Sequence, residues 1–139
     1  MALKTILHLS LAVSAMIAAG SLLLTTVMAQ PKGKVFELRT YTAAEGKLDA
    51  LQARFRDHTM RIFKKHHMTN VGYWVPVDKP NTLIYIISHP SMEAARENWA
   101  AFRNDPEWQK VQKESEANGK LTTHIESVYM EATDYSPMK

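Results

Sequence analysis

The chain has 139 residues, of which 45% are hydrophobic, and it contains no cysteine. This length suits one small domain, and the lack of cysteine excludes both disulfides and a lipid-modified cysteine anchor. The formal net charge is +3 and no long block of like charges occurs, so the composition provides no basic patch of the kind that binds nucleic acid.

The first 29 residues differ in character from the rest. Lys4 supplies a basic start, a long apolar stretch follows, and the first acidic residue is Glu37. Residues 27–29 (Val-Met-Ala) present compact side chains of the kind that a signal peptidase reads. We therefore predict a signal peptide over residues 1–29, cleavage before Gln30, and export to the periplasm or the medium with no membrane contact afterwards. An uncleaved N-terminal membrane anchor is the alternative.

The folded domain is expected from residue 34 to 133, and residues 134–139 are expected to be a frayed tail. Residues 35–41 indicate its first strand, in which successive side chains point to opposite faces. One row is suited to a core and the other to the lining of a polar pocket. The first row is Phe36, Leu38 and Thr40, and the second is Val35, Glu37, Arg39 and Tyr41.

A helix is predicted over residues 44–67, because apolar residues recur there at three- and four-residue steps. Lys64, Lys65 and two histidines follow at its end, where positive charge complements the helix dipole. Residues 71–77 indicate a second strand. Pro76 predicts that this strand lies at an edge of the sheet, since proline cannot donate to a ladder.

Residues 83–87 form a third strand that is apolar on both faces, which is typical of a central strand covered on both sides. Ser91 is suited to cap a following helix, and Asp105 with Pro106 signals the start of another. Residues 122–130 alternate again as the last strand. The order strand, helix, strand, strand, helix, strand is the split pattern of an α+β ferredoxin-like βαββαβ sandwich.

In that topology the first and third strands lie in the middle of an antiparallel sheet. The helices cover one face only, so the other face needs a cover. A second copy of the chain, packed sheet to sheet about a two-fold axis, is the simplest cover, and we predict a homodimer.

Three short segments together resemble the NIPSNAP family. They are residues 36–41 (Phe-Glu-Leu-Arg-Thr-Tyr), residues 72–74 (Gly-Tyr-Trp) and residues 105–108 (Asp-Pro-Glu-Trp). The resemblance extends over residues 34–131. It implies the fold of the dimeric α/β barrels, a superfamily with cofactor-free monooxygenases, haem-handling enzymes, isomerases and members that are not enzymes, so it leaves the function open. The export signal departs from the intracellular and mitochondrial members of the family.

The resemblance transfers no catalytic residue, so candidate residues are taken from the pattern alone. Glu37 and Arg39, with Tyr41 beside them, are predicted to face one cavity or interface, on the open face of the sheet. They either bind a polar ligand or hold a proton-transfer group, or they form a purely structural ion pair. His124 and Glu126 join them in one cluster if the last strand turns that side to the same face.

Two histidines are weak candidates for a catalytic base. His58 lies at the edge of the apolar stripe of the first helix, where its ring faces a pocket between helix and sheet or packs there without a role. His124 is the second. Tyr73 and Trp74 either stack on a planar ligand or belong to the core.

The sequence predicts no metal and no cofactor. His66 and His67 are adjacent on a helix and diverge, and glycine-rich phosphate loops and nucleophile elbows do not occur. Two functions follow as alternatives. One is a dimer that binds a small, partly apolar molecule, and the other is a cofactor-independent oxidoreductase or isomerase with His58 or His124 as base and Arg39 steadying an anion.

Overall fold

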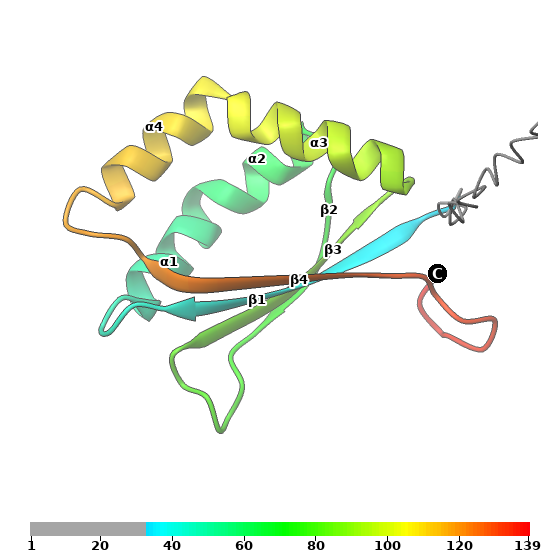
Figure 1. Cartoon of the computed structure of the whole chain (residues 1–139), viewed down its shortest axis with the longest axis horizontal. Helices are drawn as coiled ribbons and strands as arrows, with labels where there is room; N and C mark the ends of the chain where they lie inside the picture. The colour runs from blue at the N-terminus through cyan, green and yellow to red at the C-terminus, as the bar shows by residue number, and fades with distance from the viewer. Residues whose placement is uncertain (1–32) are drawn as a thin grey trace, which may run out of the picture.

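The computed structural model describes residues 33–139, and the predicted signal peptide lies outside these residues. One antiparallel sheet has the strand order β2-β3-β1-β4. All helices lie on one face of it, which gives the expected two-layer α+β ferredoxin-like arrangement (Figure 1). The strands are β1 (Val35–Ala43), β2 (Thr69–Trp74), β3 (Thr82–His89) and β4 (Thr122–Met130). The first and third strands are central, as predicted, and β4 has the predicted bounds.

The first predicted helix is a single rod with a π-helical turn in its middle. It consists of α1 (Leu48–Arg54), η1 (Phe55–Thr59) and α2 (Met60–Lys65). It begins later than predicted because Gly46 takes a φ of 67° and closes a turn before it. Between residues 33 and 139 no helix is long and apolar enough to cross a bilayer.

The second pair of helices begins at the predicted caps. In α3 (Met92–Asn104), the Ser91 hydroxyl accepts a hydrogen bond from the Ala94 N–H at 3.1 Å. In α4 (Pro106–Ser115), the Asp105 carboxylate accepts one from the Glu107 N–H at 2.8 Å. These bonds satisfy backbone donors that the first helical turn leaves without a partner.

Strand β2 is an edge strand, although not for the predicted reason. It ends at Trp74, so Pro76 lies beyond it. The register between β2 and β3 shifts between Asn70 and Gly72. A Cβ on Gly72 would collide with the indole of Trp74. The Gly-Tyr-Trp segment therefore needs its glycine for the tryptophan to lie across the strand.

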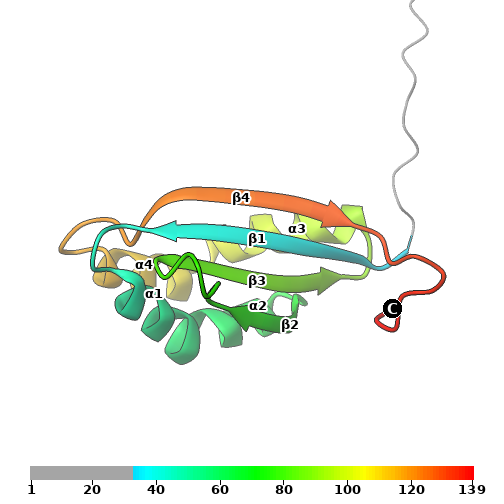
Figure 2. The same ribbon diagram turned by 90° about the horizontal axis from the view of Figure 1, so that it is seen from below.

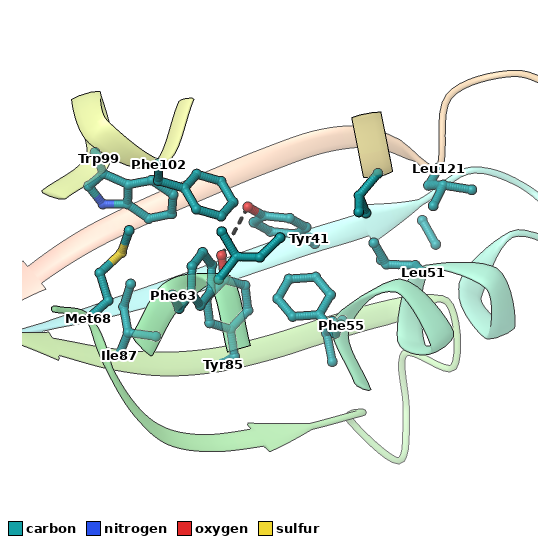
Figure 3. Close-up of a cluster of buried hydrophobic side chains, with 14 residues drawn as sticks. Tyr41, Leu51, Phe55, Phe63, Met68, Tyr85, Ile87, Trp99, Phe102 and Leu121 are labelled. Atoms are coloured by element: carbon teal, nitrogen blue, oxygen red, sulfur yellow. Dashed lines mark hydrogen bonds between the residues drawn. The ribbon is translucent and has the colours of Figure 1, made fainter. Parts of the chain in front are cut away.

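The core lies between the sheet and the helices (Figure 3). Tyr41, Leu83, Tyr85 and Ile87 reach it from the strands, and the Tyr85 hydroxyl donates a hydrogen bond to that of Tyr41 at 2.9 Å. The other residues of the cluster come mainly from the helices, and they include Leu51, Phe55, Ile62, Phe63, Trp99, Phe102 and Val111.

The two rows of β1 therefore lie on the faces of the sheet opposite to those predicted. Glu37, Arg39 and Tyr41 point toward the helices, and the open face carries Phe36 and Leu38. The ladders place further apolar side chains on that open face, because residues paired across antiparallel strands share a face. They are Ile84, Ile86, Val128 and Met130. Figure 2 views the sheet from this side, with the helices behind it.

The segment after β4, which includes the predicted tail of residues 134–139, contains no helix or strand. It turns toward the open side of the sheet (Figure 1), and a hydrogen bond of 3.1 Å from the Ser136 N–H to the Thr133 carbonyl closes a turn. Ser136 and Met138 line a groove of about 250 Å³ together with Phe36 and Ile86. The tail therefore packs at one end of the open face.

Candidate ligand-binding pocket

The pocket is built around Glu37, a carboxylate with no exposed surface in the middle of β1. Each of its oxygens has two partners. Oε1 accepts hydrogen bonds from Arg39 Nη1 and from the Ser127 hydroxyl, both at 2.6 Å. Oε2 accepts one from Trp99 Nε1 at 2.7 Å and lies 3.1 Å from His89 Nε2. Four elements of the fold thus meet at one side chain.

These contacts decide the charge of Glu37. Burial by itself raises the pKa of a carboxyl, because it disfavours the charged form. Here the hydrogen bonds from His89, Ser127 and Trp99 and the charge of Arg39 outweigh burial and lower the pKa of Glu37 to about 2. The group is a carboxylate at neutral pH with all its lone pairs in use, which makes it a poor proton acceptor.

His89 is buried beneath Glu37 and links it to α3. Its Nδ1 lies 3.5 Å from Asn98 Nδ2 and its Nε2 faces the carboxylate. The tautomer with the proton on Nε2 satisfies both contacts, since the amide then donates to Nδ1. His89 has no exposed surface, so its role here is to hold Glu37 in place.

Arg39 lies between the carboxylate and two aromatic rings. Its guanidinium carbon is 4.4 Å from the centre of the Trp99 ring and 5.4 Å from that of Tyr41. Its Nε atom is buried and has no hydrogen-bond partner within the described residues. Because 16% of the side chain stays exposed, part of this cation faces an open cleft.

That cleft has a volume of about 580 Å³ and lies between the β1 and β4 side of the sheet and the α3 and α4 helices. This volume lies within the usual range for sites that hold small molecules. The polar groups are Glu37, Arg39, Arg103, Gln109, Gln112 and Ser127, and the aromatic rings are those of Trp99, Phe102, Trp108 and Tyr129. Trp108 is held in place by Phe102, whose ring centre is 4.5 Å away.

The two candidate bases lie elsewhere. His58 is exposed and lines a surface cleft between the first helix and α4, so the prediction that it faces a pocket between helix and sheet is wrong. His124 is exposed on the open face, where its Nε2 lies 3.0 Å from Glu126 Oε1. The four-residue cluster, which depended on the facing of the last strand, therefore does not form, because β4 turns Ser127 rather than Glu126 toward Glu37.

Tyr73 and Trp74 are separated by the sheet. Tyr73 stacks on Tyr85 with ring centres 5.3 Å apart and belongs to the helix-facing layer. Trp74 lies on the open face and is 52% exposed. Neither of them lines the cleft, and adjacent strand residues cannot stack on the same ligand ring.

Several residues that line the cleft were not predicted from the sequence. Trp99, Ser127, Arg103 and Gln112 stand in no sequence motif, and Trp108 stands only in the segment of residues 105–108. The sequence signal for them is Glu37, because a buried carboxylate requires hydrogen-bond donors around it. Among residues 33–139 no group of three or more acidic, histidine or cysteine side chains is placed to hold a metal ion.

The protein is an α+β ferredoxin-like protein, since it has a four-stranded sheet with its helices on one face. Its cleft lies at the β4 side of that sheet. Residues 36–137 match the NIPSNAP family, and the chain belongs to that family. No curated protein matches the chain in sequence.

Solved structures have the same fold. A NIPSNAP family protein of unknown function from Agrobacterium tumefaciens is 25% identical, with a TM-score of 0.68 over 78% of this chain and 96% of the other. An uncharacterized NIPSNAP-like domain protein from Burkholderia xenovorans is 16% identical, with a TM-score of 0.67 over 76% and 90%. SnoaB, a cofactor-independent oxygenase from Streptomyces nogalater, is 18% identical, with a TM-score of 0.54 over 76% and 98%.

Proposed function

We propose that this NIPSNAP-family protein is exported and binds a small, partly apolar molecule in the cleft between the sheet and helices α3 and α4. One observation carries the proposal: a buried ion pair, Glu37 with Arg39, forms the polar side of a cleft whose other side is aromatic. Pockets that orient small ligands combine apolar walls with a few fixed polar groups in this way.

The exported protein is proposed to act as a homodimer with its open sheet faces in contact. Support comes from the apolar row of Leu38, Ile86 and Val128 on that face, since Val128 is 54% exposed in the single chain. Burying such a row is favourable by about 25 cal/mol for each Å² of apolar surface. The cleft lies on the opposite side of the sheet, so dimerisation leaves it accessible.

A cofactor-independent oxidoreductase or isomerase is the second candidate, and the similarity to SnoaB in fold is the observation that favours it. Such an enzyme needs a proton acceptor beside its substrate. His58 and His124 lie outside the cleft, and Glu37 is fully hydrogen-bonded with a low pKa. The described lining residues therefore favour binding over proton transfer.

Native mass spectrometry of protein purified from the exporting host tests the proposal. We expect a start at Gln30 and a bound small molecule. Gln112→Trp fills the cleft with a larger side chain and is expected to abolish retention of this molecule. Lys113→Trp on the same helix, outside the cleft lining, serves as the matched control. A protein that carries no small molecule, or that retains it in Gln112→Trp, would contradict the proposal.

A further inference from the structure

The charges that line the cleft do not cancel. Glu37 and Arg39 neutralise each other at 2.6 Å, which leaves Arg103 as the remaining charged group of the lining. Within residues 33–139, no carboxylate forms an ion pair with Arg103. The cleft therefore has a net charge of +1 and presents two guanidinium groups, one at its floor and one on α3.

The floor also contains an unused donor. Arg39 Nε is buried and has no hydrogen-bond partner among residues 33–139, although buried donors in folded proteins are almost always hydrogen-bonded. Its guanidinium is fixed by Glu37 on one side and by the Trp99 ring beneath it. A cation held in this way is preorganised for an anionic acceptor that enters the cleft.

The walls match a flat ring system. Trp99, Phe102, Trp108 and Tyr129 line the cleft, and the ring of Phe102 packs against those of Trp99 and Trp108. Aromatic surfaces bind planar molecules by offset stacking or by edge contacts. The amides of Gln109 and Gln112 stand at the α4 side as neutral hydrogen-bonding groups.

We propose that the ligand is a planar aromatic monoanion whose carboxylate, or an equivalent acidic oxygen, is bound by Arg103 and Arg39 while its ring lies among the tryptophans. This inference rests on the proposed function, because it specifies the chemical class of the molecule held in the same cleft. Neutral aromatic molecules of equal size are bound less tightly, since they offer no charged acceptor to Arg103, the cation of the lining that Glu37 does not neutralise.

Calorimetric titration with two probes of nearly the same shape, 2-naphthoate and the neutral 2-naphthamide, tests this class. We expect 2-naphthoate to bind about tenfold more tightly, the usual gain from a charge-assisted hydrogen bond. Arg103→Gln is expected to remove that difference by weakening only the binding of the anion. Arg56→Gln, which changes an exposed arginine outside the cleft lining, is the control and should leave both affinities unchanged.

The possible outcomes distinguish failure of the ligand class from failure of the cleft as a binding site. Equal binding of both probes, lost in Gln112→Trp, would overturn the anionic class while leaving the cleft as a binding site. Binding that Gln112→Trp does not affect, or no binding of either probe, would overturn the ligand class and the cleft together. A preference for 2-naphthoate that survives Arg103→Gln would overturn the role of Arg103.

Discussion

A buried carboxylate is costly unless donors replace the water that it loses, and Glu37 has four of them. The strands contribute Arg39, Ser127 and His89, and α3 contributes Trp99. Because the donors come from separate parts of the chain, the carboxylate joins β1, β3, β4 and α3 at one point. Its contribution to stability depends on its being charged.

The sign of the pH dependence follows from that charge. The pKa of Glu37 is lowered from 4.5 to about 2 on folding, so the unfolded chain binds this proton more tightly. Its stabilising contribution is present above pH 4.5 and is lost as the pH falls toward 2. We expect the free energy of unfolding to fall between pH 6 and pH 2.5 by about 2 to 3 kcal/mol more in the natural protein than in Glu37→Gln. Urea denaturation at several pH values measures this difference. The same change in the free energy of unfolding with pH in both proteins would contradict it.

Replacing Arg39 tests the two roles that its position allows. Arg39→Ala removes the charge partner of Glu37, but three other donors remain. We therefore expect a loss of about 2 kcal/mol in the free energy of unfolding, less than for a buried charge with no partner left. We also expect loss of 2-naphthoate binding in protein that is still folded. An unchanged stability would show that the pair is not structural, and unchanged binding would show that Arg39 has no part in the site.

At the scale of the elements, local patterns predicted most of what the structure contains. Strand β4 has the predicted bounds, and Ser91 and Asp105 cap their helices as expected, because both signals depend only on neighbouring residues. The first helix begins late and contains a π-helical turn, which its periodicity did not reveal. The prediction of which face each row of β1 occupies was also wrong, because the facing depends on where the helices pack.

The site was less predictable than the fold, because its residues come from distant parts of the chain. Glu37 and Arg39 are two residues apart on one strand, so their shared face was visible in the sequence. Trp99 and Ser127 are 62 and 90 residues away from Glu37, and only the packing of α3 on the sheet and the pairing of β4 with β1 bring them together. The distribution of donors around a buried charge is a tertiary property.

The end of α2 offers a test at the element scale. His67 takes a φ of 58°, in the left-handed region, directly after His66, the C-cap of the helix. The His67 N–H donates to the Lys64 carbonyl and the Met68 N–H to the Phe63 carbonyl, at 3.1 and 3.0 Å, which is the pattern of a Schellman motif that usually has glycine at this position.

Glycine at position 67 is therefore expected to stabilise the protein. His67→Gly removes the steric cost of a Cβ in the left-handed region and should raise the free energy of unfolding by about 0.5 to 1 kcal/mol. His67→Val should lower it, because a β-branched side chain is poorly tolerated there. Thermal and urea unfolding of the two variants measure the effect. A destabilised His67→Gly variant would contradict the expected relief of this steric cost.

At the scale of the whole molecule, the two faces of the sheet differ in how they are covered. One face is covered by helices and holds the cleft at its β4 side, whereas the other carries an apolar row with the C-terminal tail at one end. Apolar residues gathered on a sheet face that no helix covers, with Val128 54% exposed, are the support for our proposal that this face is an interface. The proposed homodimer covers this row and leaves the cleft open.

Strand β4 provides a matched pair of substitutions for testing the dimer. Val128 and Ile125 are both exposed, at 54% and 44%, but they point to opposite faces, because Val128 pairs with Leu38 and Ile125 with Tyr41. Val128→Lys would bury an unpaired charge between the two sheets, so we expect dimer affinity to fall by at least roughly 100-fold. Ile125→Lys lies outside the proposed interface and should leave the dimer intact. Sedimentation equilibrium over a concentration series measures both, and circular dichroism confirms that each variant is folded. If the unmodified protein is monomeric, or if Ile125→Lys dissociates it while Val128→Lys does not, the open face is not the interface.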